Sequence, residues 1–566
     1  MSSRSLQWLS LVGIIWLQSI NGTNSNFPAY SSQLKQLLSL SQIQLNNLAF
    51  ASDAGKLLGW FSGIAALYLP LWLVLIIGSS LGLLGYGLQY LFLTNQISCL
   101  SYGHIFVLTV VAGNSICWIN TVCYVVAIRN FPSYGQVVVG LTTSYFGLSA
   151  KIYTDIVDAT FSSSPTERAK AYLLLNSILP LIVCVIAAPL ARKVDAERPR
   201  NMGAGFIAMF VITVVTGVYA VISSVESISS KFSPLSRAIS MGMFLLAPLI
   251  IPVAEKITEL VRKCNIKTET KVYHFTIEEV EGAERMENGI KEIDEVFEVR
   301  EGTERILENG VKERDQEAGD VPEDSEGRPE GIIESGVKNR GEVGDQIHEM
   351  VVKEEIGVKV MLRRLDFWLY FSVYLCGATL GLVYLNNLGQ IAESRGYSGT
   401  SSLVSLASSF GFFGRLIPSL LDYFFSKTKY TLSRPASIVA LMAPTTGAFF
   451  LLVNNTNLSL QISTATIGVS SGAITSIAVS LTTELFGTKN FAVNHNVVVA
   501  NIPVGSFLFG YMAALLYRKE GHGAGRCLGM ECYRTTFVIW GSLCFVGTSL
   551  ALVLYARTRK LYMQKV

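Results

Sequence analysis

Apolar stretches of about 20 residues recur along almost the whole chain, and they constrain the fold more than any other feature. A helix needs roughly 20 apolar residues to cross the hydrocarbon core of a bilayer. Half of the 566 residues are hydrophobic and only 15% are charged, which excludes an ordinary soluble multidomain protein. Length and hydropathy predict about fourteen spans, so we expect an all-α polytopic membrane protein.

The predicted spans form a group of six, an extra pair, a long hydrophilic segment and a second group of six. Two six-helix bundles joined by one connection are typical of alternating-access carriers that are built from internal repeats. The predicted domains are an N-terminal bundle (1–200), an extra helix pair (201–260), an acidic cytoplasmic loop (261–362) and a C-terminal bundle (363–566).

The acidic loop contains a degenerate repeat, EGAERMENGIKE from Glu281 and EGTERILENGVKE from Glu301. Its composition does not bury enough apolar surface to offset the chain entropy that is lost on folding, so we expect disorder. The loop is either a solvated spacer or a regulatory segment that binds a cytoplasmic partner.

The predicted span from Gln44 to Leu67 carries Asp53 and Lys56 near its middle. An ionisable group at bilayer depth costs roughly 2.5–3.5 kcal/mol, so it requires a partner or a wet cavity. Residues three apart share one helix face and can pair. The two residues form either a structural ion pair between helices or part of a site for a substrate or a proton.

Other polar residues lie inside predicted spans at similar depth. Lys151 and Asp155 are four apart and can pair, although Lys151 can also snorkel outwards. His495 either takes part in proton coupling or is a structural histidine. Cations and amides that face one cavity would suit a small anion or carboxylate. The predicted substrate-binding residues are Asn21, Asp53, Lys56, Asn120, Lys151, Asp155, Asn386, Asn387 and Gln390.

Several segments resemble the plant nodulin-like proteins of the nuclear-fusion-defective type, among them LNNLAFASDAGKLLGWFSGIAAL, GNSICWINTVCYVVAIRNFP and TELFGTKNFAVNHNVVVANIPVGSFLFG. These proteins are members of the major facilitator superfamily, related to oxalate/formate and monocarboxylate carriers. The resemblance covers nearly all of the chain except the acidic loop. It implies a major facilitator-type fold, with 12–14 transmembrane helices, and it implies little about the cargo.

The resemblance also implies a cytoplasmic gating motif at Gly414-Arg415 and Asp422. An arginine and an aspartate at inner helix ends can pair with charges across the two bundles and release them when the bundles rock. The matching loop of the first bundle has no such charges, and the alternative is ordinary snorkelling. The predicted gating residues are Arg129, Gly414, Arg415, Asp422 and Glu484.

The distribution of Lys and Arg predicts that both termini are cytoplasmic, in a plasma membrane or an endomembrane. Cys527 and Cys532 share a hydrophilic loop and form either a disulfide or two free thiols. The sequence holds no phosphate-binding glycine loop, metal-ligand spacing or nucleophile elbow. We therefore expect no enzyme activity, no cofactor and no nucleic-acid partner.

These features predict secondary active transport of a small solute, such as an organic anion or monocarboxylate, by alternating access. A coupling proton is an expected partner beside the lipid bilayer and the small-molecule substrate. The alternative is a transporter-fold sensor or scaffold that signals through the acidic loop.

Overall fold

The computed structural model describes residues 3–132, 134–161, 164–194, 202–225, 232–264, 356–425, 433–521 and 527–563. Contacts divide the chain into one compact unit, Met1–Lys256 with Val352–Val566, and a second unit, Ile257–Val351. The repeats of the acidic loop lie outside the described residues, so their disorder and their partner stay predictions. Every regular element of the described ranges is helical.

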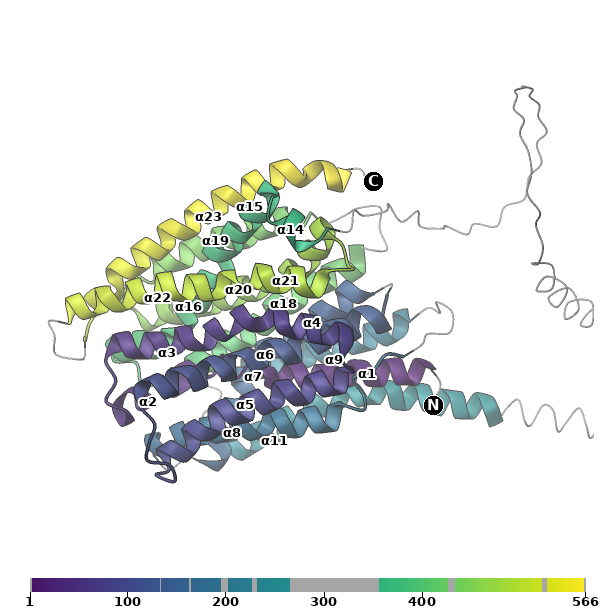
Figure 1. Ribbon diagram of the computed structural model, residues 1–566, viewed down its shortest axis with the longest axis horizontal. Coiled ribbons are helices and arrows are strands. Elements are labelled where there is room, and N and C mark those ends of the chain that lie inside the picture. Colours follow the sequence, from purple (N-terminus) through teal and green to yellow (C-terminus); the bar gives the residue numbers. More distant parts are fainter. Residues whose placement is uncertain are drawn as a thin grey trace, which may run out of the picture. The chain divides into compact units, whose positions relative to one another are not determined.

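The first half of the large unit (residues 3–194) is a bundle of helices (Figure 1). The first helix ends at Asn21, and the chain then turns, with the Ser25 amide donating to the Gly22 carbonyl at 2.9 Å. The elements are α1 (Ser3–Asn21), η1 (Phe27–Ala29), α2 (Ser31–Leu37), α3 (Gln42–Ala54), η2 (Gly55–Leu58), α4 (Gly59–Tyr68), α5 (Leu71–Leu93), α6 (Tyr102–Asn130), α7 (Gly135–Thr160) and α8 (Pro165–Ala187).

The extra pair and the second half (residues 356–563) follow. The pair consists of α9 (Gly203–Ile222) and of α11 (Pro234–Leu246), whose span continues through η3 (Ala247–Leu249) to Cys264. The second half contains α14 (Val358–Met361), α15 (Leu365–Tyr374), the π-helical turn η5 (Leu375–Thr379), α16 (Leu380–Asn386), α17 (Leu388–Ser394), α18 (Thr400–Phe425), α19 (Arg434–Leu451), α20 (Asn457–Phe486), α21 (Phe491–Val499), α22 (Asn501–Glu520) and α23 (Glu531–Met563).

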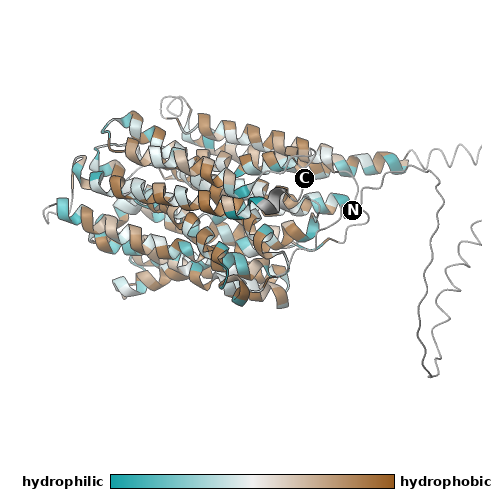
Figure 2. Cartoon of the chain, turned by 90° about the horizontal axis from the view of Figure 1, so that it is seen from above, coloured by the Kyte–Doolittle hydropathy of each residue, from teal (hydrophilic) through white to brown (hydrophobic). Residues whose placement is uncertain are grey.

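Ten helices of the described residues are long and apolar enough to cross a membrane. The other four predicted spans correspond to α1, to α3 with α4, to α7 and to α19. Large apolar side chains such as Val185, Val211 and Phe545 are more than half exposed, and apolar residues cover much of the helix surface (Figure 2). Such a surface is stable only against lipid, and the chain is a multi-pass integral membrane protein.

The helix pairings of the first half recur in the second. Helix α5 packs against α6 and α8, and α19 packs in the same way against α20 and α23. The two halves meet where α7 crosses α18 and where α3 crosses α22. Because α7 corresponds to α22 and α3 to α18, exchanging the halves turns one crossing into the other. This relation is expected of two repeats about a pseudo-twofold axis, as in a major facilitator-type fold.

The two crossings differ in how they are bonded. Along α7 and α18, Ser419 Oγ donates to the Val137 carbonyl and Ser408 Oγ donates to the Gly147 carbonyl, both at 2.6 Å. At the other crossing, Asn46 Nδ2 of α3 donates to the Gly510 carbonyl of α22 at 2.9 Å, and no hydrogen bond joins the adjoining helices α4 and α21 among the described residues. The α7–α18 crossing is therefore the more firmly bonded of the two.

Close backbone approach requires glycine at the corresponding helix contacts of both halves, α3 with α6 and α18 with α20, although on opposite helices of the contact. A Cβ atom on Gly113 of α6 would lie 1.8 Å from the Ser52 carbonyl oxygen of α3. A Cβ atom on Gly414 of α18 would lie 2.0 Å from the Val469 carbonyl oxygen of α20. Small residues at such contacts let membrane helices pack closely.

The extra pair packs beside the α7–α18 crossing. Helix α11 contacts α7, and Trp16 Nε1 of α1 donates to the Leu245 carbonyl of α11 at 2.8 Å. Helix α9 contacts α18, and the Tyr423 hydroxyl of α18 donates to the Gly203 carbonyl of α9 at 3.0 Å. One helix of the pair is thus bonded to the first half and the other to the second.

Candidate functional site

A cavity of about 160 Å³ lies between the two halves, and both halves line it. A cavity of about 150 Å³ in another protein is large enough to bind benzene, so a small organic molecule fits here. The polar and aromatic lining side chains include Asn24, Lys56, Asn120, Tyr124 and Phe146 of the first half and Tyr374, Ser408, Arg415, His495 and Asn496 of the second.

Lys56 reaches this cavity from η2, the 3-10 turn that interrupts the second span. Its Nζ lies 2.6 Å from Oδ1 of Asp53, which is fully buried at the end of α3. The predicted ion pair is confirmed. Oδ2 of Asp53 accepts a hydrogen bond from Nδ2 of Asn386 at 3.2 Å, so the pair is tied to the second half.

Three side-chain hydrogen bonds join the halves around the junction of α16 and α17, and we call this group the clasp. The clasp bonds are Asn386 to Asp53 (3.2 Å), Asn46 to Asn387 (3.0 Å) and Gln390 to Ser31 (2.9 Å). The three second-half residues had been predicted to bind substrate, and the structure places them beside the cavity and not in its lining. They bond one end of the first half to the second.

Arg415 faces the cavity from the middle of α18, and this placement differs from the expected inner helix end. It lies seven residues before Asp422, which is roughly 10 Å along a helix. Its guanidinium lies over the ring of Phe146, 5.4 Å from the centroid, and donates to the Gly411 carbonyl at 3.3 Å. No carboxylate of the described residues lies within 4.0 Å of Arg415.

Asp422 and Glu484, two of the other predicted gating residues, pair with Arg434 of their own half. Asp422 of α18 forms an ion pair with Arg434 of α19, and Arg434 Nε lies 3.6 Å from Oε1 of Glu484 on α20. Arg434 was not predicted, although its position beside the proline that opens α19 puts it at a helix end. Arg129 is exposed, and it makes no ion pair with another described residue.

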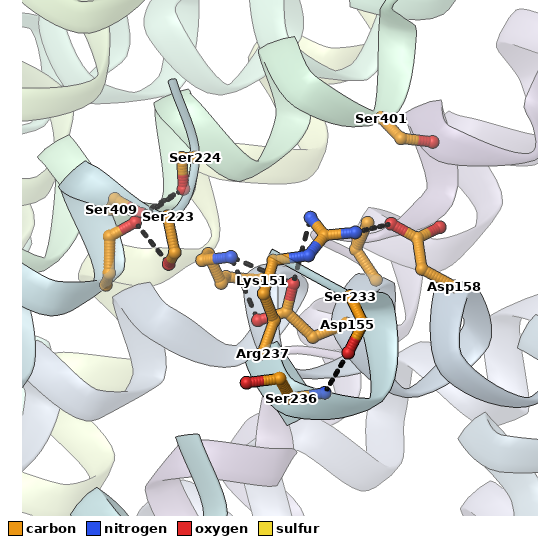
Figure 3. A network of polar contacts seen from close by, with 12 residues as sticks. Lys151, Asp155, Asp158, Ser223, Ser224, Ser233, Ser236, Arg237, Ser401 and Ser409 are labelled. Carbon is orange, nitrogen blue, oxygen red and sulfur yellow. Dashed lines mark hydrogen bonds and ion pairs between the residues drawn. The ribbon is translucent and has the colours of Figure 1, made fainter. Parts of the chain in front are cut away.

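A second buried ion network lies away from the cavity (Figure 3). Lys151 Nζ lies 2.9 Å from Asp155, as the spacing predicted, and both side chains are almost fully buried. Arg237 of α11 approaches Asp155 at 3.9 Å and Asp158 at 3.4 Å. Arg168 of α8 lies 2.6 Å from Asp158. Because none of the five lines the cavity, their position favours a structural role in attaching α11 and α8 to α7.

The remaining predicted residues lie at or just behind the cavity wall. Asn21 Nδ2 donates to Oδ1 of Asn120 at 2.9 Å, and only Asn120 of the two lines the cavity. His495 lines the cavity as well, and its ring stacks on Phe491 with centroids 5.2 Å apart. Packing of this kind fixes the orientation of the imidazole within the cavity wall.

Two family models match the chain. The Nodulin-like model matches residues 7–253, and the NFD4 C-terminal domain model matches residues 349–564. Protein NUCLEAR FUSION DEFECTIVE 4 of Arabidopsis thaliana is 35% identical over 579 aligned residues, which cover 99% of this chain and 90% of that protein. The chain belongs to the nodulin-like family. The resemblance that was read from its sequence is thus confirmed.

Solved structures with a similar course of the chain are distant from this nodulin-like protein. A structure of a proton dependent oligopeptide transporter is 11% identical in sequence, with a TM-score of 0.46. The alignment covers 99% of this chain and 100% of the transporter chain. The nucleoside transporter NupG is 10% identical, with a TM-score of 0.47, over 98% and 99% of the two chains. The fold of the nodulin-like chain rests on its own helix pairings.

Sequence reasoning missed several side chains that line the cavity of the nodulin-like protein. Tyr124, Phe146 and Tyr374 read as ordinary aromatic residues of apolar spans. One signal was available, because Asn120 and Tyr124 are four apart and therefore share a helix face. The disulfide alternative for Cys527 and Cys532 is confirmed, since the two sulfurs are bonded.

Proposed function

We propose that this protein is a secondary active transporter that moves a small organic anion, such as a monocarboxylate, by alternating access. The observation that carries the proposal is Arg415, a guanidinium in the wall of a cavity between two halves, with no carboxylate partner among the described residues. A buried charge requires a partner or solvent, and a ligand carboxylate would provide one.

Recognition would combine one charged and one apolar contact. The guanidinium of Arg415 binds a carboxylate through charge-assisted hydrogen bonds, which are about twice as strong as neutral ones. The apolar body of the ligand packs against the aromatic side chains of Phe146 and Tyr374. Because these groups come from both halves, binding depends on how the halves lie against each other.

Alternating access would follow from opening one end of the cavity while closing the other. The clasp holds the end at which α16 meets α17. Rocking of the two halves about their crossings would break the clasp and expose the cavity on that side. Asp53 is the carboxylate that we assign to proton coupling, because a proton on it would weaken its bonds to both Lys56 and Asn386.

The disulfide supports an orientation in the membrane. Disulfides persist in oxidising compartments, and the bond from Cys527 to Cys532 joins the loop after α22 to the first turn of α23. In the same loop, the Gly529 amide donates to the Ser394 carbonyl at the end of α17, at 2.8 Å. The clasp end would thus face the lumen or the exterior. The start of α1 lies at the far end of that helix, so this orientation agrees with cytoplasmic termini.

The test is uptake of labelled butyrate and benzoate into proteoliposomes that contain the purified protein, with and without an imposed proton gradient. Arg415→Gln should lower uptake by about tenfold or more, since it removes a charge-assisted contact. Arg557→Gln is the control, because Arg557 pairs with Asp366 at a partly exposed site outside the cavity. Equal uptake by wild type and Arg415→Gln would refute the assigned site.

A further inference from the structure

We propose that Asp53 determines the charge of the anion that the cavity accepts. By neutralising Lys56 it leaves Arg415 as the uncompensated cation of the described lining, so that a monoanion binds better than a dianion of the same size. This inference rests on the proposed function and makes it more specific. The inference concerns which charge of anion the cavity binds, whereas the proposed function concerns the transport of an anion across the membrane.

The charges around the cavity carry the inference. The basic side chains in the described lining are Lys56, Arg415 and His495, and no Asp or Glu of the described residues lines it. The Lys56 ammonium is 2.6 Å from Asp53. A histidine is mostly neutral above its ordinary pKa of about 6.5. The wall therefore presents one full positive charge beside a neutral ion pair.

Asp53 is held beside Lys56 in the arrangement of the halves that the structure shows. Its side chain is fully buried, and its second oxygen accepts the hydrogen bond of Asn386. One ammonium carries one charge, although it has three donors. A second ligand carboxylate near Lys56 would compete with Asp53 for that charge, and burying it without a counter-charge is unfavourable.

Removing the Asp53 charge should therefore create a site with two cations. In Asp53→Asn the amide oxygen can still accept from Asn386 Nδ2, and the shape of the side chain is kept. Lys56 then loses its internal partner while it remains in the cavity wall. A dianion could pair with Arg415 and Lys56 together.

The second lysine–aspartate pair of the chain supplies a matched control. Lys151 and Asp155 are a buried pair like Lys56 and Asp53 and are close in sequence, yet neither lines the cavity. If buried pairs acted only through stability, Asp155→Asn and Asp53→Asn would have the same effect on ligand preference. If Asp53 acts through the charge of the cavity, only Asp53→Asn changes it.

The experiment compares butyrate with succinate, which have the same number of carbons and carry one and two carboxylates. Dissociation constants are measured by ligand-induced thermal stabilisation of the full-length protein in nanodiscs, at slightly alkaline pH. Wild type should prefer butyrate. Asp53→Asn should shift the ratio towards succinate by about tenfold or more, through the added charge-assisted contact. Asp53→Asn combined with Lys56→Gln should restore the wild-type preference, and Asp155→Asn should leave it unchanged.

The outcomes separate this inference from the proposed function. An unchanged ratio in Asp53→Asn, with butyrate binding still dependent on Arg415, overturns the role of Asp53 and leaves anion transport standing. Failure of both probes to bind wild type and variants overturns both. If Asp53→Asn does not fold, Lys56→Gln alone decides the question. In that variant the Asp53 charge is no longer neutralised, so succinate binding should weaken more than butyrate binding. Equal weakening of the two contradicts the inference.

Discussion

Asn46 of α3 donates a hydrogen bond from Nδ2 to Oδ1 of Asn387 at 3.0 Å, and this bond joins the two halves of the protein. The same Nδ2 also donates to the Gly510 carbonyl of α22 at 2.9 Å. The bonds from Asn46 to Asn387 and from Gln390 to Ser31 are neutral, and each neutral hydrogen bond contributes only about 0.5–1.5 kcal/mol net. The clasp is thus strong enough to hold one end closed and weak enough to open.

Asn387→Ala should open the clasp end more often. Losing about 1 kcal/mol raises the open population about fivefold. Cys117 lines the cavity, so its alkylation by a membrane-impermeant maleimide, located by mass spectrometry, reports the opening. Asn47→Ala is the control, because Asn47 neighbours Asn46 and lies outside the clasp. An equal alkylation rate in wild type and Asn387→Ala would contradict the assignment of the clasp.

Lys151→Met should destabilise the protein, because it leaves Asp155 buried without its nearest cation. Breaking a buried ion pair typically costs about 3–5 kcal/mol. Adding Asp155→Leu removes the stranded charge and should restore much of the loss. Thermal unfolding of the purified variants measures both effects. A single variant as stable as wild type would show that Arg237 alone compensates Asp155.

Gly113→Ala should prevent close packing of α6 on α3, because the new methyl group would overlap the Ser52 carbonyl oxygen. We expect loss of folded protein on size-exclusion chromatography after expression. Gly242→Ala provides the comparison, since a Cβ at Gly242 of α11 meets nothing within 4 Å. Alanine in a helix interior is favoured over glycine by about 0.5–1 kcal/mol, so this variant should match or exceed wild-type stability.

The spans and the two lysine–aspartate pairs were accessible from sequence, since both follow from local spacing. Hydropathy over about 20 residues locates a span whatever its neighbours are. Likewise, Lys56 and Lys151 can reach a carboxylate on their own helix. Helix geometry alone fixes such pairs.

The roles of Arg415 and Arg434 were not accessible, because they depend on which helices adjoin. A motif implied that Arg415 lies at a helix end, but its place on α18 opposite Phe146 is set by the α7–α18 crossing. Arg434 becomes a partner of Asp422 only when α18, α19 and α20 pack together. The asparagines of the clasp were recognised as polar residues within spans, yet their bonding across the halves required the fold.

The two crossings are bonded unequally, and this inequality places the hinge of the protein. Ser408 and Ser419 of α18 donate hydrogen bonds to α7, whereas α4 and α21 are in contact without a hydrogen bond among the described residues. Rotation of the two halves about an axis near the α7–α18 crossing would move α4 and α21 the farthest from each other. Spectroscopic distance probes on those two helices should therefore record the largest travel during a transport cycle, and a pair on α7 and α18 should record almost none.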